Sequence, residues 1–156
     1  NALKQIANVH PSNMIVYLDA PYKRDEYSRY YHVLETAALY DYPASERKGR
    51  LRSRRNGERF KTEFFSKNVQ TVEDNLINII VSILQVSKAC IWSYSDNGVA
   101  SISKIVDRVC KEVACKMYFY SIPYKHNSQR KRDKTRNTSS LAVTEYCIVF
   151  VKKERI

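Results

Sequence analysis

The residues best suited to chemistry are Asp19, Ala20, Pro21 and Tyr22, which directly follow an apolar run at residues 14–18. A carboxylate accepts hydrogen bonds, an aromatic ring stacks on planar ligands, and proline restrains the chain between them. The run is rich in β-branched residues and predicts a buried parallel strand. Ligands bind beyond the carboxyl ends of such strands, so a site is expected here. The structural alternatives are a helix N-cap for Asp19 and a packed surface aromatic for Tyr22.

The charge of the chain indicates its partner. A net charge of +11 attracts the chain to polyanions, and nucleic acid is the partner we expect. About half of the 27 Lys and Arg residues fall in two segments, at about 43–61 and 124–138. The alternative is that both segments are solvated or disordered loops without a partner. We assign DNA contacts to these cationic residues: Arg47, Lys48, Arg50, Arg52, Arg54, Arg55, Lys125, Arg130, Lys131, Arg132 and Lys134.

Hydrophobic spacing predicts the elements that position these residues. Helical spacing occurs at residues 26–40, 68–86 and 102–113, and strand patterns at 89–95, 116–120 and 141–151. The first helix has an aromatic face, on which Tyr27 and Tyr30 are candidates to clamp DNA, with core packing as the alternative. Helices thus alternate with strands, and the last two strands can join as an antiparallel hairpin. The sequence predicts an α/β fold.

Other features narrow the setting. No apolar run is long enough to cross a membrane, and no secretory signal is present, so a cytoplasmic location is expected. The cysteines, Cys90, Cys110, Cys115 and Cys147, lack the spacing of a zinc site and predict buried thiols, and we expect no metal.

The loop and the segment behind it resemble a known family. Asp19-Ala20-Pro21-Tyr22 matches, in three of four places, the Asp-Pro-Pro-Tyr motif of amino-methyltransferases. YSRYYHVLET, at residues 27–36, is similar to the segment that follows this motif in a subset of N6-adenine DNA methyltransferases. Ser93-Tyr94-Ser95-Asp96 and residues 144–150 are similar to the later strands of that family. The resemblance implies a partial Rossmann-like methyltransferase sheet, made of the later strands and ending in an antiparallel hairpin, with flanking helices.

The resemblance also implies the chemistry of the loop, whose four residues are then catalytic. A methyl group passes from S-adenosylmethionine to the amino nitrogen of a flipped adenine, whose lone pair is delocalised and poorly nucleophilic. Asp19 and the backbone carbonyl of Ala20 each accept one amino hydrogen, while Tyr22 stacks on the base. Alanine replaces the usual proline but supplies the same carbonyl. An aspartate at the head of the loop favours adenine over cytosine.

The donor-binding half of such an enzyme is not recognisable in this chain. Family members carry a glycine-containing strand-turn for S-adenosylmethionine, whereas Gly49, Gly57 and Gly98 stand in other settings. We therefore expect residues 1–156 to be the C-terminal part of a single methyltransferase domain, with the rest upstream or on a second subunit. Joined to that half, the chain would methylate double-stranded DNA, as in restriction-modification systems, and the resemblance implies a bacterial or phage setting.

Two other functions stay open. The chain could be a non-catalytic nucleic-acid-binding relic, or a subunit of a split methyltransferase, which would show salt-sensitive DNA binding without methyl transfer. An RNA or protein amino-methyltransferase is a third hypothesis, because the same loop chemistry serves other planar amines and amides. The recognition sequence does not follow from the loops.

Overall fold

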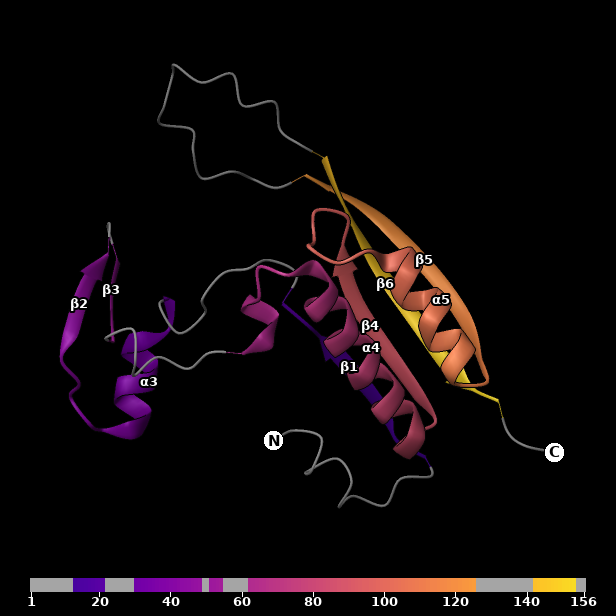
Figure 1. Ribbon diagram of the computed structural model, residues 1–156, viewed down its shortest axis with the longest axis horizontal. Helices are drawn as coiled ribbons and strands as arrows, with labels where there is room; N and C mark the ends of the chain where they lie inside the picture. Colours follow the sequence, from indigo (N-terminus) through magenta and orange to yellow (C-terminus); the bar gives the residue numbers. More distant parts are fainter. Residues whose placement is uncertain (1–12, 22–29, 49–50, 55–61, 126–141, 154–156) are drawn as a thin grey trace.

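A four-stranded mixed sheet forms the centre of the molecule (Figure 1). The computed structural model describes residues 13–21, 30–48, 51–54, 62–125 and 142–153. The strands are β1 (Ile15–Asp19), β4 (Ala89–Ser95), β5 (Cys115–Lys125) and β6 (Ala142–Lys152), and their order in the sheet is β1-β4-β6-β5. Strand β1 runs parallel to β4, whereas β6 is antiparallel to both β4 and β5. The expected α/β alternation and the final antiparallel hairpin are both confirmed.

Two helices cover one face of this sheet, α4 (Val69–Val86) and α5 (Ile102–Glu112). Their bounds agree closely with the sequence prediction. The Asn68 side chain caps the start of α4 by accepting a hydrogen bond from the backbone N–H of Gln70, at 3.0 Å. The last turn of α4 ends where Ser87 turns the chain into β4, only two residues before that strand begins.

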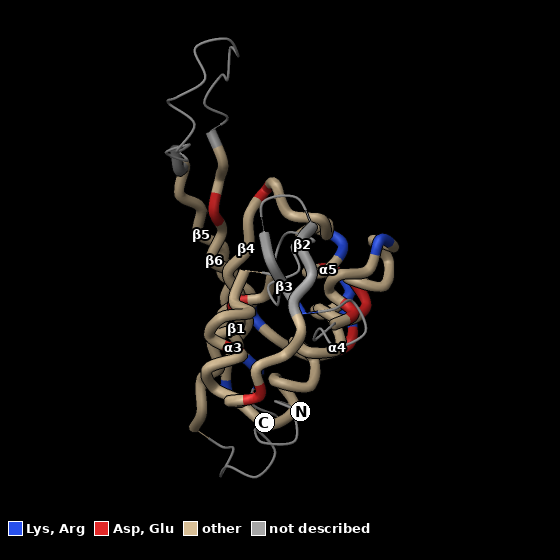
Figure 2. The backbone as a smooth tube through the Cα atoms, turned by 90° about the vertical axis from the view of Figure 1, so that its left-hand side faces the viewer, with Lys and Arg blue, Asp and Glu red and all other residues tan. Residues whose placement is uncertain are grey.

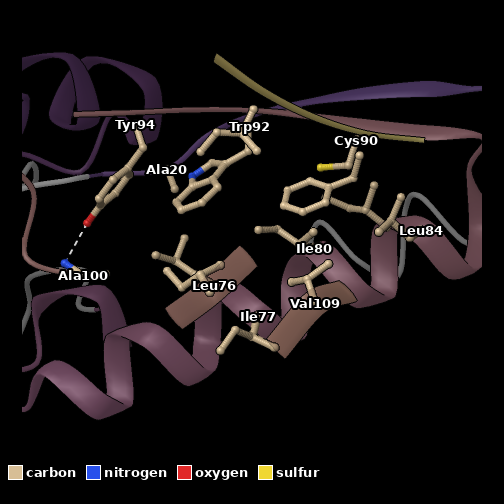
Figure 3. Packing of buried hydrophobic residues seen from close by; sticks show 14 of the residues in the cluster. Ala20, Leu76, Ile77, Ile80, Leu84, Cys90, Trp92, Tyr94, Ala100 and Val109 are labelled. Atoms are coloured by element: carbon tan, nitrogen blue, oxygen red, sulfur yellow. Dashed lines mark hydrogen bonds between the residues drawn. The ribbon is translucent and has the colours of Figure 1, made fainter. Parts of the chain in front are cut away.

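The core lies between these helices and the central strands (Figure 3). Alternate residues of β4, which are Cys90, Trp92 and Tyr94, point toward the helices and are almost fully buried. From the neighbouring strand, Ile148 pairs with Trp92 and Phe150 with Cys90, so their side chains extend the same layer. Burying each large apolar side chain stabilises the fold by roughly 1.5–3 kcal/mol. This layer therefore holds β4 in place next to the loop that follows β1.

The opposite face of the sheet is not covered by any helix in the described part of the chain. Tyr17 on β1 is 62% exposed and Tyr120 on β5 is 59% exposed. Our prediction of a buried strand at residues 14–18 was therefore wrong in part, because β1 buries only its Val16 and Leu18 side, against the core. Within the described residues, β1 pairs with β4 alone and is an edge strand.

A second, two-stranded sheet was not predicted. Strands β2 (Ser45–Lys48) and β3 (Leu51–Arg54) pair antiparallel within the basic segment that we expected to be a loop. Helix α3 (His32–Leu39) lies beside this hairpin, apart from the main sheet (Figure 1), and the short 3-10 helix η1 (Glu63–Phe65) leads back to α4. Helix α3 is shorter than the expected 26–40 in its described part and buries none of its residues. The core-packing alternative for its aromatic residues fails at Tyr30, which is 56% exposed.

Candidate functional site

The predicted loop begins at the carboxyl end of β1, as the strand pattern required. Asp19 is the last residue of β1, Ala20 is 3% exposed against the core, and Pro21 is half-buried. Tyr22 lies outside the described residues. Ala20 is anchored beside the buried Trp92 (Figure 3), so the backbone directly after Asp19 is held by the core. The loop therefore starts from a fixed point, although its sequence lacks the second proline.

A pocket of about 240 Å³ opens at this end of the sheet. Three strands contribute to it, and its lining is polar at the rim, with residues Tyr17, Asp19, Ser93, Tyr94, Ser95 and Glu145. Ligand pockets for whole small molecules usually span about 300–1,000 Å³. The described residues thus line a small, partly open polar pocket, below the usual size for a whole small molecule.

Within the pocket, Asp19 is held by a neighbouring hydroxyl group. Ser93 Oγ donates a hydrogen bond to Asp19 Oδ1 at 3.2 Å, and Tyr17 Oη donates to Ser93 Oγ at 3.0 Å. Among the described residues, Asp19 Oδ2 has no hydrogen-bond partner. The helix N-cap alternative for Asp19 depends on backbone N–H groups from Tyr22 onward, which lie outside the described residues. One carboxylate oxygen is thus available to a ligand.

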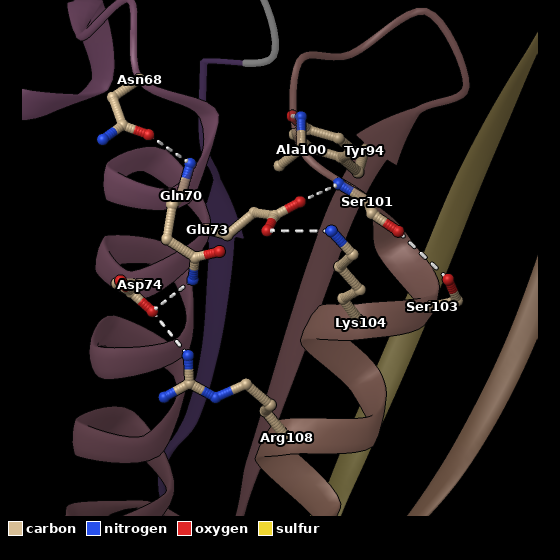
Figure 4. Close-up of polar contacts among 10 residues, drawn as sticks. All are labelled: Asn68, Gln70, Glu73, Asp74, Tyr94, Ala100, Ser101, Ser103, Lys104 and Arg108. Atoms are coloured by element: carbon tan, nitrogen blue, oxygen red, sulfur yellow. Dashed lines mark hydrogen bonds and ion pairs between the residues drawn. The ribbon is translucent and has the colours of Figure 1, made fainter.

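Tyr94, which lines the pocket, also fixes the turn that follows β4. Its ring is buried, and its hydroxyl oxygen accepts a hydrogen bond from the Ala100 backbone N–H at 3.0 Å (Figures 3 and 4). Burial raises the pKa of the Tyr94 phenol, since the charged form would lose its solvation. The Gly98 backbone passes directly over the ring, and a Cβ there would lie 2.6 Å from Tyr94 Cζ. This turn requires glycine because the ring occupies the space of a side chain.

A buried carboxylate then fixes the start of α5 (Figure 4). Glu73 on α4 is 2% exposed and accepts a hydrogen bond from the Ser101 backbone N–H at 2.9 Å. The ammonium group of Lys104 lies 3.9 Å from the same carboxylate. Glu73 therefore acts as a cap from a neighbouring helix, satisfying one of the free N–H groups at the first turn of α5. Together with the Tyr94 contact at Ala100, this hydrogen bond holds the end of the 96–101 turn.

Sequence reasoning missed most of the residues around Asp19. Ser93 and Ser95 stand in a segment whose family likeness we noted, but we gave them no role, and we did not single out Tyr17 or Glu145. A signal existed for Tyr17, because side chains two residues apart on a strand share a face, which placed it beside Asp19. Nothing in the sequence indicated Glu145, since its position depends on the register between β4 and β6.

Only some of the residues that we predicted to contact DNA lie in the described part of the chain. Arg47 and Lys48 lie in β2, Arg52 in β3, and Lys125 at the end of β5. The other predicted cations and one aromatic residue lie outside the described residues: Arg50, Arg55, Arg130, Lys131, Arg132, Lys134 and Tyr27. The structure does not bring the hairpin onto the pocket, because β2 and β3 lie with α3 away from the main sheet (Figure 1).

Arg54 has a partner within the protein. Its side chain is buried and donates two hydrogen bonds of 2.7 Å to the carboxylate of Asp41, and its Nε lies 3.5 Å from Glu35. The Arg54 guanidinium holds the pKa of Asp41 below its usual range, chiefly by hydrogen bonding. We predicted a DNA contact for Arg54, but this geometry directs its charge inward, where it joins α3 to the hairpin.

The surface formed by α4 and α5 has little excess charge. Basic and acidic segments intermingle there (Figure 2), and ion pairs join Arg108 to Asp74 and Lys111 to Asp107. The first of these pairs crosses between the helices, and Asp74 also accepts a hydrogen bond from Gln70 (Figure 4). The helical face is therefore not the source of the strong positive charge of the chain.

The cysteines do not form a metal site. No group of three or more His, Cys, Asp and Glu side chains in the described ranges could hold a metal ion. Our prediction of buried thiols is correct only for Cys90, since Cys110 is exposed and the other two cysteines are half-buried. An amphipathic helix exposes every residue on its outer side, whatever its polarity, which explains Cys110 on α5.

Comparison with known proteins gives one match. Residues 1–89 match the family model described as D12 class N6 adenine-specific DNA methyltransferase. The matched region contains β1, the Asp19 loop, the hairpin and α4. No curated protein and no solved structure matches the chain. In the described part of the chain, every helix is too short or too polar to cross a membrane.

Proposed function

This chain belongs to the D12 class of N6 adenine-specific DNA methyltransferases, and from that premise we propose that the Asp19 pocket holds the target adenine. The observation that carries the proposal is the state of Asp19, which lines a small polar pocket and whose carboxylate is held through Oδ1, while Oδ2 has no partner among the described residues. A carboxylate oxygen in this state is suited to accept a hydrogen bond from an amino group.

The proposed chemistry concerns the amino nitrogen of a flipped adenine. Asp19 Oδ2 accepts one amino hydrogen and the backbone carbonyl of Ala20 accepts the other, which orients the nitrogen and stabilises the positive charge that develops on it. Preformed acceptors of this kind need no reorganisation during the reaction, because Ala20 is anchored in the core and Asp19 is bonded to Ser93. Tyr22 is proposed to stack on the base, which offsets part of the unstacking cost of roughly a few kcal/mol.

The methyl donor of this class of reaction is S-adenosylmethionine, which supplies an electrophilic methyl group. The described residues do not make a site for it. The only described glycine, Gly98, lies against the Tyr94 ring rather than in a phosphate- or nucleoside-binding turn, and the pocket is small. We propose that the donor is held by polypeptide outside the described residues, either elsewhere in the same protein or on a second chain.

The sheet topology also supports a methyl-donor site outside the described residues. We propose that the β1-β4-β6-β5 sheet is the later part of a Rossmann-like methyltransferase sheet, and that residues 1–156 are the C-terminal part of one such domain. Strand β1 has a free edge in the described part, where a further parallel strand can pair. The site lies at the carboxyl ends of β1 and β4, where parallel sheets of this class bind ligands.

We further propose that the two basic segments hold the DNA backbone. The helical face is neutralised by its own ion pairs, and Arg54 is committed to Asp41, so the excess positive charge lies elsewhere. Replacement of Arg52 by Gln should weaken DNA binding and lower the slope of log affinity against log salt by about 0.9. Lys111→Gln on α5 is the matched control, because it removes one exposed cation outside the basic segments. Equal effects of the two changes would argue against the assignment.

The central experiment tests Asp19. Replacement of Asp19 by Ala in the complete gene product should lower methyl transfer to DNA by about 100- to 1,000-fold, the usual cost of losing one preorganised group. Affinity for DNA should stay within about twofold, because the phosphate contacts are untouched. The measurements are transfer of a radiolabelled methyl group and fluorescence anisotropy of labelled duplex.

The matched control for this experiment is Asp107→Ala. Asp107 is an exposed aspartate on α5 whose carboxylate accepts a hydrogen bond from Lys111, so its loss changes the net charge equally. Full methyl transfer in the Asp19→Ala variant would overturn the proposed function. Loss of transfer in both variants would show that the effect comes from charge or stability rather than from the pocket.

A further inference from the structure

The pocket contains a chain of side-chain hydrogen bonds that the reaction chemistry alone does not call for. Tyr17 Oη donates to Ser93 Oγ at 3.0 Å, and Ser93 Oγ donates to Asp19 Oδ1 at 3.2 Å. Asp19 is the register partner of Ser93 on the adjacent parallel strand, and Tyr17 stands two residues before Asp19 on the same face. The three groups therefore form a continuous row on the uncovered face of the sheet, ending at the pocket.

The number of hydrogens that each hydroxyl can donate fixes the direction of the hydrogen bonds in this row. A serine hydroxyl has one hydrogen to donate, and Ser93 gives it to Asp19, so its lone pairs are left to receive the Tyr17 hydroxyl. Hydrogen bonds arranged in one direction polarise and strengthen one another. Asp19 Oδ1 is thus the terminal acceptor of the row, and the rotation of the carboxylate about its side-chain bonds is restricted.

Other hydroxyl groups of the protein are used differently. Thr36, Ser82 and Ser87 each donate to a backbone carbonyl four residues earlier, a local contact that hydroxyls commonly make in helices. Ser93, in contrast, bonds a side chain 74 residues away in the sequence. An exposed carboxylate at a strand end needs no protein donor, because water can satisfy it. Water could therefore supply most of the stabilisation that this row gives to the fold. The main effect of the row is on the orientation of the Asp19 side chain.

We propose that Ser93, supported by Tyr17, is a positioning residue that sets the Asp19 carboxylate so that Oδ2 faces the amino group of the base. This inference rests on the proposed function and deepens it. Ser93 also lines the pocket, but in this scheme its effect on the reaction comes through Asp19. Removing its hydroxyl leaves the carboxylate charged and present but free to rotate, so the productive orientation is populated only part of the time.

The first test measures Asp19 directly and needs no activity. Three-bond NMR couplings report whether the Asp19 side chain holds one rotamer about its first side-chain bond. The wild-type protein and Ser93→Thr, which keeps a hydroxyl, should show a single rotamer. Ser93→Ala should show averaging, and Tyr17→Phe should show a smaller effect in the same direction. A single, unchanged rotamer in Ser93→Ala would overturn the proposal.

The second test links that orientation to the reaction. In single-turnover methyl transfer by the complete gene product, Ser93→Ala should slow the chemical step by about tenfold, whereas DNA affinity should change by less than about twofold. Ser93→Thr should restore most of the rate, which a general loss of stability would not explain. Ser82→Ala, which removes a helix hydroxyl outside the pocket, is the control and should react at the wild-type rate.

The two tests separate failure of this inference from failure of the proposed function. If Asp19 gains rotational freedom in Ser93→Ala but the rate is unchanged, the positioning role is overturned. The proposed function is then decided by Asp19→Ala alone. If Asp19→Ala retains full activity, the proposed function fails, and the positioning role fails with it, even where the NMR couplings still show the Ser93 contact.

Discussion

Replacement of Tyr94 by Phe tests how the turn beside the pocket is held. The ring can stay in place, but the Ala100 backbone N–H loses the oxygen that accepts its hydrogen bond at 3.0 Å. Tyr94 is 2% exposed and Ala100 is 8% exposed, so water does not readily replace that oxygen. A buried donor left without a partner costs about 1–3 kcal/mol. For a chain of this length that loss corresponds to a fall in Tm of about 2–12 °C.

The assay can use the single tryptophan of the chain. Trp92 is fully buried, and its ring centroid lies 5.0 Å from that of Tyr94, so its fluorescence reports unfolding at the right place. Urea unfolding of the Tyr94→Phe variant gives the change in free energy. Tyr118→Phe is the control, because Tyr118 is 48% exposed on β5 and its free energy should stay within about 0.5 kcal/mol of wild type. An equally small change at Tyr94 would refute the reasoning.

The same substitution has a pH signature. Burial raises the pKa of Tyr94 above the value of about 10 that it has in the unfolded chain. Between these two pKa values the unfolded state releases its proton first, so stability is full below about pH 10 and falls as the pH rises above it. Tyr94→Phe lacks this contribution. The difference in free energy of unfolding between wild type and variant should therefore shrink from about pH 8 to about pH 11.

Three further predictions concern groups near the same core. Gly98→Ala should destabilise the fold by about 1–3 kcal/mol in urea unfolding, because its Cβ would meet the buried Tyr94 ring. Glu73→Ala should cost about 1–3 kcal/mol by leaving the Ser101 N–H without an acceptor; Glu73→Gln, which keeps an oxygen, should recover much of that loss in the same assay. Cys90 should be the last thiol to react with an alkylating reagent followed by mass spectrometry, because burial raises its pKa to about 12, and Cys110, which is exposed, should react first.

The main sheet and the helices that cover it could be predicted because their apolar residues recur at the spacing of a helix or a strand. Residues 68–86 repeat apolar side chains at helical spacing, and the turn at Asp96-Asn97-Gly98 separates a strand from a helix. The hairpin in the basic segment could not be predicted. Its strands, SERK and LRSR, contain almost no apolar residues, so no hydrophobic alternation distinguishes them from a loop. Their pairing is a backbone property that the side-chain pattern does not reveal.

The site could be predicted only in its local part. Asp19 and Ala20 are recognisable because they directly follow a strand, and that signal spans a few residues. The contacts of Asp19 depend instead on register, since β1 and β4 are separated by about 70 residues and a shift by one residue would turn Ser93 to the other face. The same limit applies to Glu145 on β6. Sequence reasoning thus placed the Asp19 loop at the end of a strand but could not assemble the residues around it.

Arg54 shows why the number of cationic residues in a segment overstates the positive charge that the segment offers to DNA. Arg54 stands within the most basic stretch of the chain, yet it is 6% exposed and bonded to Asp41. The hydrogen bonds from Arg54 keep the Asp41 pKa low, so this contact is intact at neutral pH and weakens as the pH falls below about 3.9, the ordinary range of aspartate. At neutral pH the Arg54 charge therefore serves to join α3 to the hairpin.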